Sequence, residues 1–440
     1  MIERNATEVG SKTMRTLRRS ALTRTVAIAF SLSATFAATS AFAQVVNAPV
    51  DAGGDIAAAP AAAASGAYDM LVGTYTTTNT KSKGIYVYRF DPATGKTQLL
   101  SVTQAVNPSY LAFAKDNRHV YAVSEIPGDA KPGSKGGYID AYRFDPASGN
   151  LRFMNQVSSE GNDPTYLAMA PDGRYLATAN YSVAADPGGS LSMFPVESDG
   201  RVGMAAVNIH HEGSGPVSGR QDSSHVHSTV FSPDGQYLFA SDLGVDKVYA
   251  YHYQPQMQSD APGSNVMGPL RPTANGYIAR PAGAGPRHLV FDASAKHAYL
   301  TSELNASVSV FDYNDGAMKQ VQVVAMTKPG FKGAVGGGAI HLSDDGRFLY
   351  TSNRGDVNQI VTYTVNPSTG KLTLVDRISS QGKTPREFAI DPSGRWMIVG
   401  NQDSDDAFWY KRDPQTGKLT ATPMRMDLGS PVFFKFVSAH

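Results

Sequence analysis

The chain has 440 residues, of which 41% are hydrophobic and 18% are charged, and its formal net charge is +1 at pH 7. This composition is typical of a globular protein with a large core. The absence of cysteine excludes disulfides, thiolate nucleophiles and cysteine-ligated metals. Glycine is abundant at 42 residues, and Asp-Gly turns recur, which favours many short strands over long helices.

The first 43 residues have the organisation of a secretory signal peptide. An apolar run at residues 25–36 follows a basic stretch, and Ala41-Phe42-Ala43 forms an A-x-A cleavage site. We therefore expect Gln44 to begin a mature protein in the periplasm or outside the cell, with Met14 as an alternative start. A membrane anchor is the other interpretation, but the apolar run is shorter than the roughly 20 residues that a span needs. The basic residues are Arg15, Arg18, Arg19 and Arg24.

Residues 44–67 are rich in alanine, proline and glycine without a period, so we expect a flexible linker. Removal of residues 1–43 would take away six basic and two acidic side chains and leave a net charge of −3. A weakly acidic domain without a basic stripe argues against nucleic acid as a partner. No membrane partner is expected after cleavage, and the oligomeric state stays open.

A unit of about 50–60 residues recurs six times from Asn107 onward, a spacing in the range of propeller repeats. Each copy begins with an apolar strand, often led by proline, as in Pro108–Phe113. A tight turn such as Pro171-Asp-Gly-Arg174 then leads into a second apolar strand such as Tyr175–Ala179. The copies begin near Asn107, Asp163, Ser224, Gly285, Gly337 and Thr384.

A seventh copy is split between the two ends of the repeat region. Asp69–Thr74 and Ile85–Phe90 supply two of its strands, and the missing first strand occurs at Ser430–Val437. Closing the ring in this way removes the unpaired edge of an open array. We therefore predict an all-β fold, a seven-bladed β-propeller over residues 68–440 whose C-terminal strand closes the first blade. A six-bladed ring with both end pieces outside it is the alternative.

Comparison of equivalent positions locates a candidate site, because the first strand of each propeller blade lines the central channel. The aligned residues of that strand are Ser109, Thr165, His227, Arg287, Gly338, Arg386 and Val432. The aligned residues at the end of the next strand are Glu125, Tyr181, Leu243, Glu303, Arg354 and Gln402. We expect the histidine, arginines and glutamates of these columns to surround the channel mouth, a typical place for a ligand pocket. Alternatively, the arginines bridge blades through ion pairs with Asp242, Glu303 or Glu387.

Other signals are weaker. The His225-Val-His227 spacing alternates on a strand, so only one of the two should face the channel, and we expect neither a metal nor another cofactor. His210 and His211 are expected to be solvated in a loop. The glycines at 336–338 indicate close backbone approach, since no helix follows to complete a phosphate site. No Gly-x-Ser-x-Gly motif supports a serine hydrolase.

The motifs together resemble the seven-bladed propeller lactonase family, which includes propeller-type 6-phosphogluconolactonases and the fungal carboxymuconate lactonizing enzyme. The resemblance covers nearly everything from Leu71 to Phe436, and Ser224 stands where the family usually has proline. The motifs that carry it are Asn107-Pro-Ser-Tyr-Leu, Ser224-His-Val-His-Ser, Ser232-Pro-Asp-Gly, Ser241-Asp-Leu-Gly-Val-Asp, Gly285-Pro-Arg-His-Leu, Thr301-Ser-Glu-Leu, Asp345-Gly-Arg-Phe-Leu-Tyr-Thr-Ser-Asn-Arg-Gly355 and Thr384-Pro-Arg-Glu-Phe.

The resemblance implies hydrolysis of a sugar-type lactone, with a histidine, two arginines and a glutamate at the site. These match His227, Arg287, Arg354 and Glu303, the same residues that the columns select. His227 suits a general base, the arginines suit a developing oxyanion, and Glu303 either orients the imidazole or is itself the base. The expected substrate-binding residues are Arg386, His225, His288 and Asn353.

Two other functions stay open from the sequence. The same residues could serve a lactonising cycloisomerase that holds a muconate-type dicarboxylate between arginines. The propeller could also be a non-catalytic secreted binding module, because a fold alone does not define a function. For a lactonase, export favours an unphosphorylated gluconolactone over 6-phosphogluconolactone as the small-molecule substrate.

Overall fold

The structure is a computed structural model that describes residues 66–77, 80–128, 136–182, 188–256 and 268–439. The predicted signal peptide and nearly all of the predicted linker lie outside the described residues. Within the described ranges, no helix is long and apolar enough to cross a membrane.

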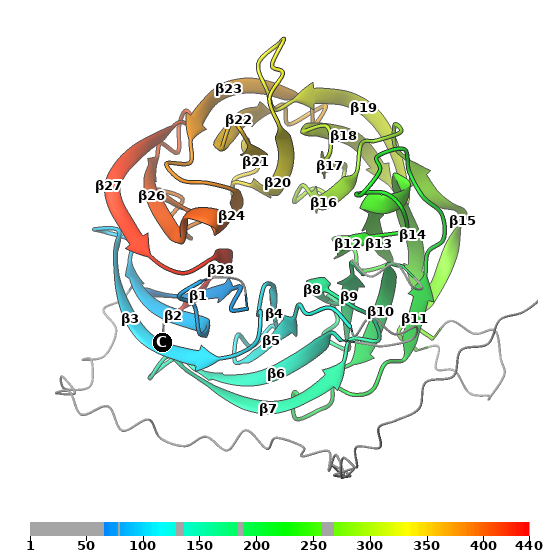
Figure 1. Cartoon of the computed structure of the whole chain (residues 1–440), viewed down its shortest axis with the longest axis horizontal. Coiled ribbons are helices and arrows are strands. Elements are labelled where there is room, and N and C mark those ends of the chain that lie inside the picture. The colour runs from blue at the N-terminus through cyan, green and yellow to red at the C-terminus, as the bar shows by residue number, and fades with distance from the viewer. Residues whose placement is uncertain (1–65, 78–79, 129–135, 183–187, 257–267, 440) are drawn as a thin grey trace, which may run out of the picture. The chain divides into compact units, whose positions relative to one another are not determined.

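Residues 68–438 form seven antiparallel sheets of four strands each, arranged around a common centre (Figure 1). The prediction of a seven-bladed propeller is confirmed. The six-bladed alternative is wrong, because the C-terminal strand and the first three strands form a complete blade together. We number the blades from this one along the chain.

The strands occupy equivalent positions in all seven blades. The innermost strands are β28 (Pro431–Ser438), β4 (Leu111–Phe113), β8 (Pro164–Met169), β12 (Val226–Phe231), β16 (Pro286–Phe291), β20 (Val335–Leu342) and β24 (Pro385–Ile390). The second strands are β1 (Tyr68–Thr74), β5 (His119–Ser124), β9 (Tyr175–Asn180), β13 (Tyr237–Asp242), β17 (His297–Ser302), β21 (Phe348–Gly355) and β25 (Trp396–Asn401).

The two outer positions complete each sheet. The third strands are β2 (Gly84–Asp91), β6 (Tyr138–Asp145), β10 (Ser190–Pro195), β14 (Lys247–Tyr253), β18 (Ser307–Asn314), β22 (Gln359–Val365) and β26 (Asp406–Arg412). The outermost strands are β3 (Lys96–Gln104), β7 (Asn150–Ser158), β11 (Val207–His210), β15 (Leu270–Ala279), β19 (Ala317–Ala325), β23 (Leu372–Ser379) and β27 (Leu419–Asp427). Two short 3₁₀ helices, η1 (Leu243–Val245) and η2 (Gln402–Ser404), follow β13 and β25.

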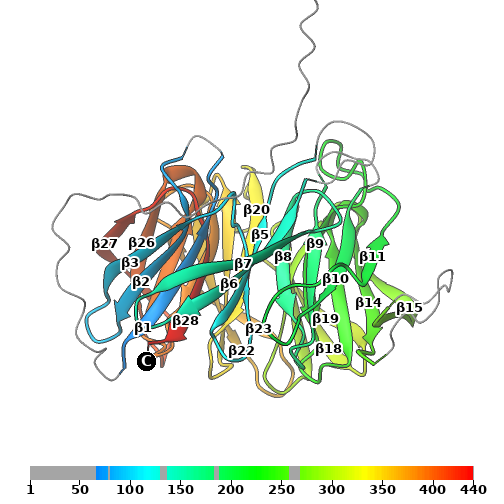
Figure 2. The same ribbon diagram turned by 90° about the horizontal axis from the view of Figure 1, so that it is seen from below.

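The first blade closes the ring by pairing the two ends of the described chain. β28 runs antiparallel to β1 from Tyr68 opposite Ser438 to Thr74 opposite Pro431. Figure 2 shows the two strands side by side within this blade. Because β28 covers the inner edge of β1, that edge has no unpaired backbone groups to offer another chain.

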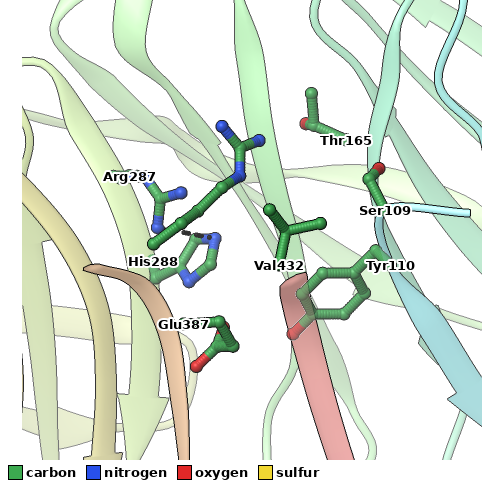
Figure 3. A pocket seen from close by; sticks show the side chains of 8 residues that line it. Ser109, Tyr110, Thr165, Arg287, His288, Glu387 and Val432 are labelled. Carbon is green, nitrogen blue, oxygen red and sulfur yellow. Dashed lines mark hydrogen bonds between the residues drawn. The ribbon is translucent and has the colours of Figure 1, made fainter. Parts of the chain in front are cut away.

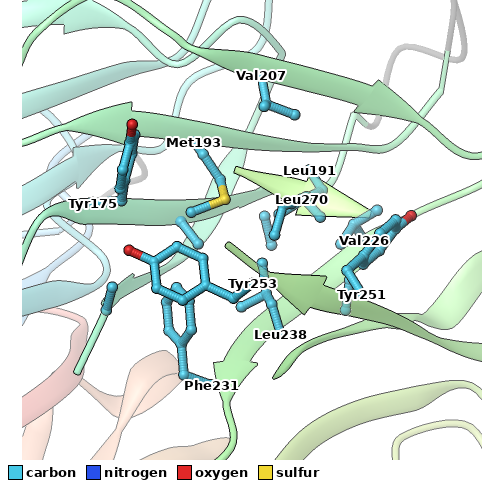
Figure 4. Close-up of a cluster of buried hydrophobic side chains, with 14 residues drawn as sticks. Tyr175, Leu191, Met193, Val207, Val226, Phe231, Leu238, Tyr251, Tyr253 and Leu270 are labelled. Atoms are coloured by element: carbon cyan, nitrogen blue, oxygen red, sulfur yellow. The ribbon is translucent and has the colours of Figure 1, made fainter. Parts of the chain in front are cut away.

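The core lies between the faces of neighbouring blades. β9 and β13 are buried at every position, whereas β3 at the rim contains only exposed and partly buried residues. Figure 4 shows one such interface, where Leu191 and Met193 of the third blade meet Val226, Leu238 and Leu270 of the fourth. Burial of apolar side chains on both faces explains the continuous apolar runs of the second strands.

Candidate active site

Backbone bulges place the aligned residues of the innermost strands at the channel. In six of the seven blades that the structure describes, the pairing register between the innermost strand and the second strand shifts at the aligned residue of the innermost strand or beside it. On β12, for example, Val226 and Ser228 pair with consecutive residues of β13, which leaves His227 between them as the extra residue. A β-bulge re-aims a side chain in this way and is frequent next to active sites. The shifts lie at or beside Thr165, His227, Arg287, Gly338, Arg386 and Val432.

Glu303, which follows β17, lies at the centre of a cluster that contains the three other predicted catalytic residues. Its Oε2 atom lies 3.1 Å from Nε of Arg287 and 2.8 Å from Nη2 of Arg354. The Nε2 atom of His227 lies 3.7 Å from the same oxygen. The fourth, fifth and sixth blades therefore each contribute a cationic or titratable group to a single carboxylate.

Burial and charge set the protonation states in this cluster. Burial alone would raise the pKa of Glu303, but the charges of Arg354, Arg287 and Arg220 hold it well below its usual range. Burial and the neighbouring charge of Arg354 lower the pKa of Arg287 to about 9. Burial and the charge of Arg287 also lower the pKa of His227 well below the ordinary histidine range. At neutral pH the site therefore combines a carboxylate, guanidinium cations and a neutral imidazole.

The glycines of β20 bring the sixth blade close to its neighbours. A Cβ atom on Gly337 would lie 2.5 Å from the carbonyl oxygen of Ser302, so the predicted close backbone approach is confirmed. Arg354 donates from Nε to the carbonyl of Gly336 at 3.3 Å and from Nη2 to that of Gly337 at 3.0 Å. These bonds and Glu303 hold the Arg354 guanidinium in place, so it acts through its fixed charge more than through free donors.

The four predicted substrate-binding residues occupy different places. His288 accepts a hydrogen bond from Nη1 of Arg287 at 3.2 Å, if its Nε2 atom is unprotonated. His225 stacks on the Tyr181 ring at 4.5 Å. Asn353 is fully buried and accepts a hydrogen bond from the backbone N–H of Gly336, so it supports β20 from behind.

Arg386, the fourth of these residues, reaches from β24 toward the first and second blades. Its guanidinium lies 5.2 Å from the centre of the Tyr75 ring and 3.9 Å from Oε2 of Glu125. Tyr75 donates to Oε1 of Glu125 at 2.7 Å, and Ser109 donates to Oε2. Burial raises the pKa of Glu125. A second polar cluster therefore lies on the first, second and seventh blades. It consists of Arg386, Glu125, Tyr75 and Ser109.

A small pocket lies where residues of these two clusters come together (Figure 3). Figure 3 shows Arg287, His288 and Glu387 on one side of it and Ser109 and Thr165 on the other. Arg386 and Val432 also line it. Oε1 of Glu387 lies 2.6 Å from Nε2 of His341 and accepts a hydrogen bond from the backbone N–H of Phe388.

Sequence reasoning missed Arg220, which comes from the segment between β11 and β12. It donates to Oε1 of Glu303 and, at 3.4 Å, to the Tyr181 hydroxyl. Its side chain is 44% exposed, whereas that of Glu303 is 6% exposed, so Arg220 forms the solvent side of the cluster. The fully buried Gln221 fixes this segment by donating to the carbonyl of Leu243. Because the segment has no counterpart in the other repeats, column comparison could not find Arg220.

The prediction that His211 is solvated is wrong. His210 is exposed as expected, but it ends strand β11 and does not lie in a loop. His211 is buried, with Nδ1 2.9 Å from Asp242 and Nε2 2.9 Å from the Tyr251 hydroxyl. Asp242 also accepts from the Ser224 hydroxyl at 2.6 Å and from the backbone N–H of His225 at 2.8 Å. The serine in place of the family's usual proline thus ties the start of β12 to the end of β13.

The alternative interpretation, in which the arginines form ion pairs between blades, applies to Glu303 and not to Asp242 or Glu387. Among the described residues, Asp242 and Glu387 contact histidines, hydroxyls and backbone groups and form no arginine ion pair. The described residues also contain no group of three or more His, Asp or Glu side chains that could hold a metal ion.

Fold and site together define a class of protein, a seven-bladed β-propeller whose channel gathers a neutral imidazole, guanidiniums and a carboxylate. A family model described as a seven-bladed β-propeller lactonase matches residues 69–436. The chain belongs to this family and is a lactone-hydrolysing enzyme.

Individual relatives agree with this assignment. The 6-phosphogluconolactonase of Bacillus subtilis (strain 168) is 33% identical over 375 residues, covering 84% of this chain and 98% of the relative. That of Formosa agariphila is 33% identical over 377 residues, covering 84% and 100%. The solved structure of a Pseudomonas aeruginosa periplasmic gluconolactonase is 44% identical with a TM-score of 0.78, covering 85% of this chain and all of that one.

Proposed function

We propose that this enzyme opens the ring of an unphosphorylated sugar lactone such as glucono-δ-lactone, in the periplasm. The signal-like residues 1–43 support export, and the likeness to a periplasmic gluconolactonase supports both the compartment and the substrate. The curated relatives named 6-phosphogluconolactonase favour the phosphorylated lactone as the competing substrate. Neither a cycloisomerase nor a binding module gains support from these comparisons.

The observation that carries the proposal is the convergence of His227, Arg287 and Arg354 on Glu303. Lactone hydrolysis needs a base for water and a positive charge for the oxyanion that forms at the carbonyl. The neutral imidazole of His227 can accept a proton, whereas Glu303 is a weak base because three guanidiniums neutralise it. This assigns the base role to His227 and the orienting role to Glu303.

The reaction then runs in two steps. His227 takes one proton from water while the remaining hydroxide forms a bond to the carbonyl carbon, and Arg287 and Arg354 stabilise the oxyanion. The tetrahedral intermediate collapses by breaking the bond between that carbon and the ring oxygen. The ring oxygen takes the proton back from the imidazolium of His227, which Glu303 stabilises. The product is a sugar acid, whose carboxyl group then loses its proton to solvent at neutral pH and becomes a carboxylate.

Purified His227→Ala and Arg287→Ala variants test this mechanism on glucono-δ-lactone. Loss of the base should lower kcat by about 10²–10⁴-fold, and loss of the oxyanion donor by about 10²–10³-fold. His252→Ala on β14 and the exposed Arg201→Ala are matched controls that should keep wild-type rates. Wild-type turnover in both site variants, with intact folding by circular dichroism, would refute the proposal.

Arg220 offers a second test, on the solvent side of the site. Arg220→Ala should lower kcat/KM by about tenfold, because a charge-assisted hydrogen bond to Glu303 is lost. Arg220→Lys should recover part of that loss. Comparing glucono-δ-lactone with its 6-phosphate in the wild-type enzyme decides the substrate, and a higher kcat/KM for the phosphate would overturn the unphosphorylated assignment.

A further inference from the structure

The pocket in Figure 3 contains guanidinium donors that the protein does not use. Arg386 lines this pocket, and within the described part of the chain it donates no hydrogen bond. Its nearest carboxylate oxygen, in Glu125, lies 3.9 Å away, too far for a good hydrogen bond. The three other arginines near the channel, Arg220, Arg287 and Arg354, all donate hydrogen bonds to neighbouring groups.

Within the ranges that the structure describes, only two of the three guanidinium nitrogens of Arg287 have a hydrogen-bond partner. Its Nε atom donates to Glu303 at 3.1 Å and its Nη1 atom lies 3.2 Å from His288. Among the described residues, nothing accepts from Nη2. The pocket therefore has two cations with available N–H groups, a pair suited to a planar carboxylate.

The carboxylates near the pocket do not fill this role. Glu303 is surrounded by Arg220, Arg287 and Arg354, and Glu387 accepts from the Phe388 N–H and lies against His341. Glu125 lies nearest to Arg386, at 3.9 Å, and Tyr75 and Ser109 hold it by donating to its two oxygens. Its distance from Arg386 leaves the guanidinium partly neutralised and still able to bind another anion.

We propose that this pocket binds the carboxylate of the sugar acid product between Arg287 and Arg386, and that Glu125 limits how tightly the product is held. The proposal rests on the proposed function, since ring opening turns a neutral lactone into an anion. A site with unopposed cations would keep that anion and slow turnover. A fixed carboxylate beside Arg386 weakens the attraction and favours product release.

Binding of D-gluconate, measured by isothermal titration calorimetry on the purified mature protein, tests the proposal without depending on turnover. Arg386→Met should weaken gluconate binding by about tenfold or more, the size of a lost charge-assisted contact. Glu125→Gln keeps the shape and removes the charge, so it should tighten gluconate binding by about three- to tenfold. The double variant should bind like Arg386→Met alone, because Glu125 acts through Arg386.

Matched surface variants control for charge changes elsewhere. Arg201→Met and Asp427→Asn each remove one partner of an exposed ion pair and should bind gluconate like the wild type. Unchanged affinity in Arg386→Met, or weaker binding in Glu125→Gln, would overturn the proposal. If Arg386→Met does not fold, the direction of the Glu125→Gln effect decides alone, since damage to the structure would not tighten binding.

A wild-type protein that turns over glucono-δ-lactone but does not bind gluconate would overturn this inference and leave the proposed function standing. Conversely, gluconate binding that depends on Arg386, in a protein without lactonase turnover, would refute the proposed function and keep the carboxylate site.

Discussion

At the residue scale, the site owes its chemistry to one buried carboxylate. Glu303 would be costly to bury alone, and its charge is stabilised because Arg220, Arg287 and Arg354 surround it. Burial, together with the charge of Arg287, makes protonation of His227 unfavourable, so the imidazole stays neutral where an exposed histidine would be partly charged. The proposed base and the charge proposed to stabilise the oxyanion are thus set by contacts within the same cluster.

These shifts predict the pH profile of lactone hydrolysis. A general base acts in its neutral form, so activity is lost as the pH falls through the pKa of His227. Because that pKa is lowered, kcat/KM should hold through the usual histidine range near about 6.5 and fall only well below it. On the alkaline side, kcat/KM should fall near pH 9 as Arg287 loses its proton.

Initial rates in matched buffers, with the uncatalysed hydrolysis subtracted, measure this profile. The predicted protonation state of His227 would be contradicted by an acid limb centred at or above the ordinary histidine value. An Arg287→Lys variant should shift only the alkaline limb.

At the element scale, the inner strands do more than line the channel. In six blades the pairing shift turns the inner strand out of its regular alternation, and the residue before the strand often has a left-handed backbone, as in Asp163 and Thr384 with φ of 50° and 58°. On β12 the entry is held by Asp242, which accepts hydrogen bonds from Ser224 and from the backbone of His225. The position of His227 thus depends on a buried network with no direct part in the chemistry.

Replacing Asp242 should therefore destabilise the protein. Asp242→Asn leaves His211 and Ser224 with a poorer acceptor, and we expect a loss of about 3 kcal/mol in the free energy of unfolding. Burial opposes the ionised form, but hydrogen bonds from His211 and Ser224 keep the pKa of Asp242 below its usual value. Its contribution is therefore present above the unfolded pKa of about 3.9 and is lost as the pH falls.

Urea denaturation of the wild type and the variant at neutral and acidic pH measures the effect. The difference between them should shrink toward low pH. The exposed Asp199→Asn serves as the control and should change stability little, and an equally stable Asp242→Asn protein would show that the network is unimportant.

At the scale of the whole molecule, the ring brings distant parts of the chain to one channel. Arg386 and Tyr75, more than 300 residues apart in the sequence, meet because β24 of the last blade lies beside the first blade. The closure by β28 fixes this neighbourhood, since β28 contacts both β1 and β24. The second polar cluster therefore exists only in a closed ring.

Ending the chain after Gly429, which removes β28, should abolish a cooperative unfolding transition and cause aggregation through the exposed edge of β1. Ending it after Ser438 keeps β28 and should leave thermal unfolding unchanged. Scanning calorimetry and size-exclusion chromatography compare the two. A soluble truncated monomer with native Tm would show that ring closure is dispensable.

The repeats explain how much could be predicted in advance. They place His227 and Arg287 at one equivalent position of the blades and Glu303 and Arg354 at another. A ring of equivalent blades brings the residues at these two positions together. Arg220 has no equivalent in other repeats, so no comparison could find it. His211 was misjudged because its partner Asp242 lies 31 residues further along the chain.

The repeat pattern by itself determined the all-β class, the seven blades and the strand that closes the ring, because turns and apolar strands are local signals. It also determined which residue types occupy the channel positions. Only the tertiary structure decided which of those side chains are buried together, which guanidiniums are already occupied and which way each pKa moves. Burial and Coulomb energies depend on distances between atoms from different blades, and those distances arise only when the ring is formed.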